Sequence, residues 1–171
     1  MARLFFALWP PDAARAALAR HAVDVAERCG GRPVAAAKIH LTLAFLGELS
    51  PPRAAAACAA ADRVTGEAFV VTFDRLGAFT RSGVAWVAPS RPPAPLEALA
   101  AALAARLRES GFALEERAFA AHVTLARRIR RKLDGALPEP LAWEAKAFAL
   151  VESDLRTGSY ATRGSWVLGT R

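Results

Sequence analysis

The segment His40-Leu41-Thr42-Leu43-Ala44 recurs as His122-Val123-Thr124-Leu125-Ala126 in a chain of 171 residues. The offset between the copies, 122 minus 40 or 82 residues, is close to half the chain, which indicates two similar halves. No low-complexity linker separates the halves. We therefore expect a single domain, residues 1–171, in which two lobes pack against each other with a cleft between them.

Strand and helix patterns alternate on either side of both copies. Short apolar runs predict strands at residues 3–8, 39–46, 69–73, 84–88, 122–126, 144–152 and 165–168. Helices are expected at residues 13–29, 51–64 and 96–107, where capping residues, alanine-rich sequence or a leucine stripe occur. A basic loop containing proline is expected at residues 127–140. The pattern predicts a fold of mixed strands and helices.

Composition excludes several classes of protein. Hydrophobic residues make up 54% of the chain, yet no apolar run reaches the roughly 20 residues of a membrane-spanning helix. Residues 3–8 form an apolar run too short for the core of a signal peptide, so we expect a cytoplasmic protein with no membrane association. Cys29 and Cys58 lack metal-binding spacing and the chain has three histidines, so we expect neither a metal nor another cofactor.

The charge balance is compatible with a nucleic-acid partner. Lysine and arginine number 23 against 16 aspartates and glutamates, which gives a net charge of +7. Arginine greatly outnumbers lysine and alanine is abundant, a bias that a GC-rich genome also produces. The charge alone therefore does not identify a partner.

The repeated motif itself points to chemistry. Side chains alternate along a strand, so His40 and Thr42 share one face, about 7 Å apart, and His122 and Thr124 repeat the arrangement. With lobes related by approximate two-fold symmetry, two imidazoles and two hydroxyls would face one small ligand. Near neutral pH one histidine can take a proton from water while the other gives one to a leaving oxygen, and the threonines can bind phosphoryl oxygens. Opening a cyclic phosphodiester requires this division of roles.

The chain resembles the two-histidine phosphoesterase superfamily, in particular the bacterial and archaeal RNA 2′,3′-cyclic phosphodiesterases, also called 2′-5′ RNA ligases. The resemblance rests on both motifs, on residues 3–8, 117–127 and 150–153, and on Tyr160. It implies a bilobal α+β fold in which two pseudo-symmetric antiparallel-sheet lobes with outer helices surround a central cleft. It departs from the family at Ala121, where proline is common before the histidine.

The resemblance also implies site roles and partners. His40 would donate a proton to the leaving O3′ and His122 would accept one from water, although the near-symmetry makes these roles reversible. Thr42 and Thr124 would hold phosphate oxygens, and the product would be a 2′-phosphate. The implied partner is an RNA with a 2′,3′-cyclic phosphate end, such as a tRNA fragment. No ATP-binding loop is visible, so any ligase activity would be ATP-independent reversal.

Several alternatives remain open at this level. Arg127 is a candidate phosphate ligand, and the other cations of residues 127–132 either extend a positive surface toward RNA or belong to a solvated loop. The substrate could instead be a small cyclic phosphate or a 2′-5′-linked oligonucleotide. A different class of function is an RNA-end-binding module without turnover. We expect the protein to act as a monomer.

Overall fold

One sheet of nine strands organises the computed structural model, which describes residues 1–169. In chain order the elements are β1 (Ala2–Leu8), α1 (Asp12–Cys29), β2 (Arg32–Pro33), the short 3-10 helix η1 (Ala36–Lys38), β3 (Leu41–Leu49), α2 (Pro51–Ala61), β4 (Phe69–Phe79), β5 (Val84–Ala88), α3 (Ala94–Glu109), β6 (Val123–Arg127), β7 (Gly135–Ala145), β8 (Ala147–Ser153) and β9 (Tyr160–Val167).

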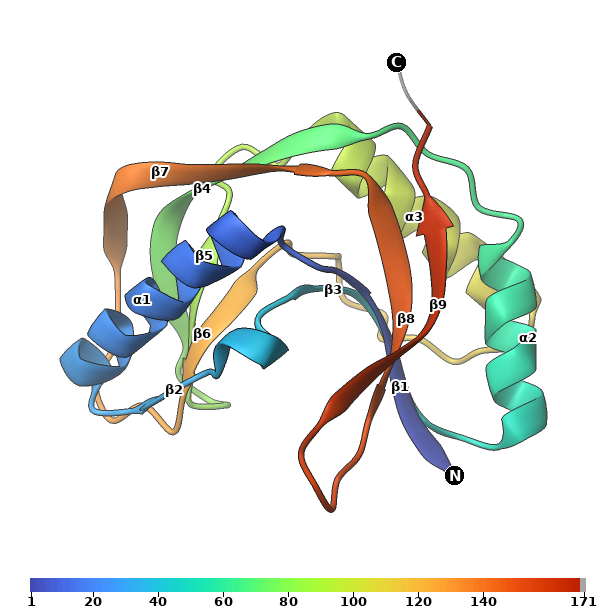
Figure 1. Ribbon diagram of the computed structural model, residues 1–171, viewed down its shortest axis with the longest axis horizontal. Helices are drawn as coiled ribbons and strands as arrows, with labels where there is room; N and C mark the ends of the chain where they lie inside the picture. The colour runs from blue at the N-terminus through green and yellow to red at the C-terminus, as the bar shows by residue number, and fades with distance from the viewer. Residues whose placement is uncertain (170–171) are drawn as a thin grey trace.

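The sheet divides at its centre into two matching halves. Its strand order is β7-β4-β5-β6-β3-β1-β8-β9, with β2 paired to β6, and the ladders between these strands are antiparallel. The strands β6, β5, β4 and β7 form one half, and β3, β1, β8 and β9 form the other. Figure 1 shows β4, β5 and β6 on the left and β1, β8 and β9 on the right, with β7 crossing the top of the view between them. The predicted α+β fold with two antiparallel-sheet lobes is confirmed.

The helices cover the outer faces of the sheet in a crossed arrangement. Helix α1 follows β1 of one half but packs on β6 of the other, whereas α3 follows β5 and packs against β3 and β4. Figure 1 shows α1 beside the β4–β6 half, and α2 with α3 beside the opposite half. Helix α1 buries Leu18, Val25 and Cys29 on one stripe and ends at Gly30, whose left-handed φ of 67° suits glycine. Helices α1 and α3 therefore each connect one half to the other.

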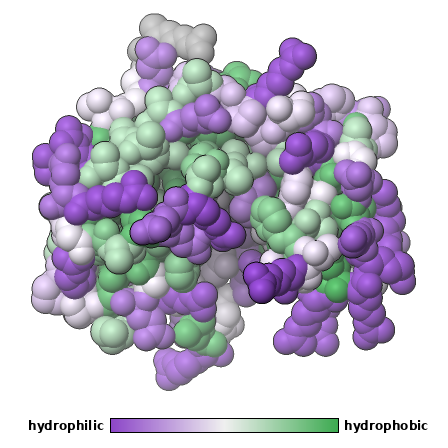
Figure 2. Space-filling model, turned by 180° about the vertical axis from the view of Figure 1, so that it is seen from behind, coloured by the Kyte–Doolittle hydropathy of each residue, from purple (hydrophilic) through white to green (hydrophobic). Residues whose placement is uncertain are grey.

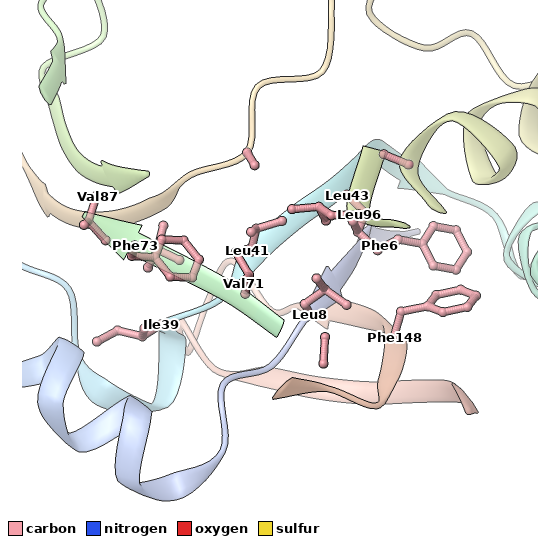
Figure 3. Close-up of a cluster of buried hydrophobic side chains, with 14 of the residues drawn as sticks. Phe6, Leu8, Ile39, Leu41, Leu43, Val71, Phe73, Val87, Leu96 and Phe148 are labelled. Atoms are coloured by element: carbon pink, nitrogen blue, oxygen red, sulfur yellow. The ribbon is translucent and has the colours of Figure 1, made fainter. Parts of the chain in front are cut away.

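A shared hydrophobic core joins the two halves. Figure 3 shows buried side chains of one half, including Phe6, Leu8 and Phe148, in the same cluster as Val71 and Phe73 of the other. Leu41 and Val123, from the two repeated motifs, belong to this cluster and are fully buried. None of the helices in residues 1–169 has the length and apolar character needed to cross a membrane.

The predictions for residues 127–140 and 144–152 were partly wrong. Strand β7 begins at Gly135, inside the expected loop. It lies at the edge of the sheet, and its register against β4 skips residues 137–140, so Pro138 and Pro140 remove no ladder hydrogen bond. The expected strand at residues 144–152 is broken at Lys146, where the chain passes from β7 in one half to β8 in the other.

Candidate active site

The two repeated motifs meet at the centre of the sheet. Leu41 of β3 pairs with Val123 of β6, and both side chains point into the core. The neighbours on either side of this pair point to the opposite face, because side chains alternate along a strand. His40, Thr42, His122 and Thr124 are accordingly half-buried on one common face. In this antiparallel register each histidine lies across from the threonine of the other motif.

Both histidines are oriented by the same backbone contact. The Nδ1–H of His40 donates to the carbonyl oxygen of Lys38 at 2.6 Å, and the Nδ1–H of His122 donates to that of Ala120 at 2.8 Å. In each case the acceptor lies two residues earlier in the chain. A carbonyl can only accept, so Nδ1 carries the proton and Nε2 of the neutral ring keeps its lone pair. Nε2 is thus the atom of each ring that is available for proton transfer.

The two Nε2 atoms differ in their surroundings. The Thr42 hydroxyl donates to Nε2 of His40 at 2.9 Å. Nε2 of His122 forms no hydrogen bond with any group of residues 1–169. The near-symmetric site is therefore asymmetric in the free protein, with one imidazole engaged and the other open.

Burial and nearby positive charges both favour the neutral form of the two imidazoles. Burial lowers the pKa of His40 and of His122, and this effect exceeds the raising effect of the Nδ1 hydrogen bonds. The positive charge of Arg127 lowers the pKa of both histidines, and His122 itself lowers that of His40. Arg117 adds to the effect on His122. A bound phosphate anion would offset these cations and favour protonation of one ring.

Aromatic rings surround His40. The ring centroid of Phe5 lies 4.8 Å from that of His40, and those of Tyr160 and Trp9 lie at 5.7 and 5.8 Å. Lys38 places its ammonium 5.5 Å from the Tyr160 ring. This apolar wall explains the strong desolvation of His40. Sequence reasoning did not assign Phe5, Trp9 or Lys38 to the site, although Phe5 does stand out as a large residue on the strand face opposite Leu4 and Phe6.

The second half provides a smaller aromatic contact to His122. The Phe79 ring stands edge-on to His122 at 5.2 Å and is 5.5 Å from the Trp86 ring. Trp86 pairs with Thr124 across β5 and β6, so both residues lie on the face of the sheet that carries the histidines. Neither Phe79 nor Arg117 was assigned to the site from the sequence. The ring contact of Phe79 and the positive charge of Arg117 both act on His122 from segments outside the motif.

Arg127 reaches the same face through a bulge. Thr124 pairs with Trp86 and Arg127 pairs with Val84, so one residue of β6 is skipped between them. Residues paired across strands share a face, which places Arg127 on the side of Thr124 despite the odd spacing. The first motif has the same bulge, since Thr42 pairs with Ala7 and Phe45 with Phe5. Phe45 is therefore the counterpart of Arg127 in the other half.

The basic loop after Arg127 is fixed to α1. The backbone N–H groups of Arg130 and Arg131 donate to the carbonyl of Cys29, and the Arg131 guanidinium donates to the carbonyls of Glu27 and Arg28. Figure 2 shows hydrophilic side chains projecting from this end of the molecule, at the lower right. Arg131 thus caps the C-terminal end of α1. Arg127, at the end of β6, instead lowers the pKa of both histidines.

A cavity of about 620 Å³ adjoins the histidine site but includes neither histidine. It lies near the start of α1 and the junction of β7 and β8, and it shares Trp9 with the aromatic wall of His40. Its lining consists of Trp9, Pro11, Ala13, Ala14, Leu141, Ala142, Trp143, Glu144, Lys146, Ala147, Phe148, Ala149 and Ser165. We assign the chemistry to the histidine face, because the cavity lining contains no histidine. Residues 1–169 contain no group of three or more His, Cys, Asp or Glu side chains placed to hold a metal ion.

Comparisons with known proteins show the family and the fold of the chain. Residues 10–156 match the family described as the 2′-5′ RNA ligase superfamily. The RNA 2′,3′-cyclic phosphodiesterase of Escherichia coli is 35% identical over 160 residues, which cover 93% of this chain and 88% of that protein. The crystal structure of E. coli LigT in its apo form superimposes with a TM-score of 0.86 at 32% identity, covering 99% of this chain and 98% of the other. A protein of Thermus thermophilus, also named RNA 2′,3′-cyclic phosphodiesterase, is 32% identical over 167 residues, covering 90% of this chain and 83% of its own.

Proposed function

This chain belongs to the 2′-5′ RNA ligase superfamily, and from that premise we propose that it is an RNA 2′,3′-cyclic phosphodiesterase that leaves a 2′-phosphate. The observation that carries the proposal is the paired histidine geometry. Two imidazoles on one face of the sheet each donate Nδ1–H to a carbonyl two residues earlier, so Nε2 is the proton-transferring atom of both rings; it is open in His122 and accepts the Thr42 hydroxyl in His40. The names of the relatives from E. coli and T. thermophilus support the choice of substrate.

The proposed reaction is a single displacement at phosphorus. Water forms a new P–O bond while Nε2 of His122 takes its proton, and the P–O3′ bond breaks as Nε2 of His40 delivers a proton to O3′. The open Nε2 of His122 supports its role as base. The Lys38 and Ala120 carbonyls stabilise the protonated forms of His40 and His122 alike, so the role of His40 as acid follows from the role of His122 as base. Proton exchange with solvent then restores both histidines.

Thr42, Thr124 and Arg127 are proposed to stabilise the phosphoryl group. The two hydroxyls flank the Leu41–Val123 pair and can donate to the non-bridging oxygens, whose charge grows in the transition state. Arg127 lies beyond Thr124 on the same face and supplies a positive charge. None of these groups requires ATP. Ligation by the same site would be the same displacement with the 5′-hydroxyl of a second RNA in place of water, so that a P–O5′ bond forms as the P–O3′ bond breaks and a 2′-5′ linkage results.

Product analysis tests this proposal. An oligoribonucleotide with a 2′,3′-cyclic phosphate end is incubated with the wild type, His40→Ala, His122→Ala and the control His21→Ala, in EDTA, and followed by phosphorus NMR. The proposal predicts a 2′-phosphate from the wild type and His21→Ala, with each motif variant slowed about 10²–10⁴-fold. Binding without turnover by the wild type would identify an RNA-end-binding module instead. Turnover of small cyclic phosphates or 2′-5′ oligonucleotides but not of this RNA would assign a different substrate.

The setting of the reaction is part of the same proposal. The RNA ends are proposed to come from fragments such as those of tRNA, and the protein is proposed to act in the cytoplasm as a monomeric domain of residues 1–171. A symmetric pair of motifs on one chain supports the last point, because one chain supplies both histidines. Light scattering during turnover checks it, and a dimer mass would contradict it.

A further inference from the structure

Arg127 has a second arginine directly opposite it. The two-residue strand β2 pairs with the end of β6, so that Arg32 pairs with Arg127 and Pro33 with Ala126. Residues paired directly across antiparallel strands project from the same face of the sheet, with their Cβ atoms about 4.5–5.5 Å apart. Arg32 therefore lies on the face that carries Arg127 and the two histidines.

The backbone around Arg32 is held close to β6. The N–H of Val34 donates to the carbonyl oxygen of Leu125 at 2.8 Å. A Cβ at Gly31 would lie 2.7 Å from the carbonyl oxygen of Arg127, so a glycine at this position permits the close approach of the two strands. The residues on both sides of Arg32 thus fix the point from which its side chain projects.

The guanidinium groups of this pair lack an anionic partner in the free protein. Arg32 and Arg127 are exposed, and neither side chain forms a hydrogen bond or an ion pair with a group of residues 1–169. Like charges directly opposite each other destabilise a sheet. Arg131 differs, because its guanidinium donates to the carbonyls of Glu27 and Arg28. An anion bound by Arg32 and Arg127 would offset their repulsion, so the pair is suited to an anionic ligand.

The pair lies on the leaving-group side of the site. In the proposed reaction the ribose departs on the side of His40. Strand β6 runs from His122, beside the attacking water, past the level of His40 to Arg127. Strand β2 lies on the same edge of β6 as β3, because β5 occupies the other edge. Arg32 is therefore in line with His40 and about 7–10 Å beyond it, in the direction away from His122.

The two flanks of the leaving-group side differ in chemistry. The aromatic rings of Phe5, Trp9 and Tyr160 surround His40 on the flank of β1 and β9. The two arginines lie on the flank of β2 and β6. A nucleotide whose ribose departs at His40 carries a base with an aromatic face and an anionic 5′-phosphodiester. Charge complementarity directs the phosphodiester to the arginine flank.

The two arginines lie at different distances from the histidines. The positive charge of Arg127 lowers the pKa of both His40 and His122, whereas Arg32 contributes to neither shift. Arg127 is thus the cation nearer to the phosphate that reacts, and Arg32 is the next cation outward on the same face.

We propose that Arg32 binds the phosphodiester joining the cyclic-phosphate nucleotide to the nucleotide before it. The inference rests on the proposed function, because the cyclic end must occupy the two histidines with its ribose on the side of His40. The next anionic group of the RNA is then this phosphodiester, which a guanidinium can bind through two parallel hydrogen bonds. The site therefore prefers RNA ends of two or more nucleotides over cyclic mononucleotides.

The test compares three substrates and four proteins. The substrates are a cyclic mononucleotide, a dinucleotide with a 2′,3′-cyclic phosphate end, and the same dinucleotide with an uncharged methylphosphonate linkage. The proteins are the wild type, Arg32→Gln, the charge-conserving Arg32→Lys and the control Arg20→Gln, which replaces an exposed arginine on α1, on the other face of the sheet. Calorimetry with the 2′-phosphate dinucleotide measures binding separately from turnover.

The proposal predicts that Arg32→Gln lowers kcat/KM for the charged dinucleotide about tenfold more than for the other two substrates, chiefly through KM. For this substrate the slope of log(kcat/KM) against log salt concentration should become shallower by about 0.7 in Arg32→Gln, whereas Arg32→Lys should keep the wild-type slope. Equal effects of Arg32→Gln on all three substrates, an effect matched by Arg20→Gln, or an unchanged salt slope in Arg32→Gln would overturn the proposal.

The calorimetry separates this inference from the proposed function. If the wild type hydrolyses none of the substrates, the proposed function fails. Tighter binding of the 2′-phosphate dinucleotide by the wild type than by Arg32→Gln would then still support the role of Arg32, and equal binding by the two proteins would overturn it.

Discussion

The Thr42 hydroxyl donates to Nε2 of His40 at 2.9 Å, whereas Nε2 of His122 has no hydrogen-bond partner within residues 1–169. In the proposed reaction the hydroxyl turns from His40 to the phosphate when a substrate binds and the ring becomes protonated. This difference separates two halves whose backbones repeat each other, and it underlies the assignment of His122 as the base.

Replacing either motif threonine with valine tests the role of the hydroxyls. Thr42→Val and Thr124→Val keep the shape of the side chain but remove one donor to the phosphoryl group, so we expect kcat to fall about 10²–10³-fold. Thr42→Ser and Thr124→Ser serve as controls and should keep most of the activity. Valine variants as active as the serine variants would show that the hydroxyls do not bind the transition state.

Replacing Arg127 should change the pKa of both histidines at once. Its charge lowers the pKa of His40 and of His122, so Arg127→Gln should raise both pKa values, as followed by NMR titration of the imidazole protons. Arg128→Gln is the matched control, since Arg128 is the next residue and does not contribute to either shift. A rise at only one histidine would place Arg127 on one side of the site.

The lowered histidine pKa values also predict how stability depends on pH. The unfolded chain binds protons at its histidines near the ordinary pKa of about 6.5, before the folded chain does. The free energy of unfolding should therefore be highest above this value and should fall as the pH decreases below it. Urea unfolding at pH 7.5 and pH 5.5 measures the difference. This difference in the free energy of unfolding should be smaller in His40→Ala and His122→Ala. An unchanged difference in both variants would contradict the lowered histidine pKa values.

Gly77→Ala tests the packing of the Trp86 ring against β4. The added Cβ would collide with the Trp86 ring, so either the indole or the β4 backbone must move. We expect a loss of about 1–3 kcal/mol in the free energy of unfolding, measured in urea. Combining Gly77→Ala with Trp86→Leu should cost less than the sum of the two single changes, because the smaller side chain relieves the clash. Strict additivity would show that the ring and the glycine do not compete for space.

The repeated motif predicted part of the centre of the fold. A histidine, an apolar residue and a threonine in succession specify one polar and one buried face, and two copies at half-chain spacing specify two halves. The direct pairing of the two motif strands at Leu41 and Val123 was not predicted, because the pattern does not specify which strands are neighbours. Strand β7 was missed in part, because Pro138 and Pro140 indicate a loop unless the strand is known to lie at a sheet edge.

The surroundings of the histidines could not be predicted in the same way. Phe5 and Phe79 reach the site from other strands, and their position depends on register. The bulges that place Phe45 and Arg127 on the site face reverse the alternation on which sequence reasoning relies. Arg127 was identified from its charge and its place after the motif, and Phe79 had no such signal.

The most direct test of the two-histidine account replaces the leaving oxygen with sulfur. In a 2′,3′-cyclic substrate with a 3′-S–P bond, the departing thiolate needs no proton, so the acid becomes dispensable while the base does not. The account predicts that this substrate restores single-turnover cleavage by His40→Ala nearly to the wild-type rate but leaves His122→Ala slow. Rescue of His122→Ala alone would reverse the two roles, and rescue of neither variant would contradict paired acid–base catalysis by His40 and His122.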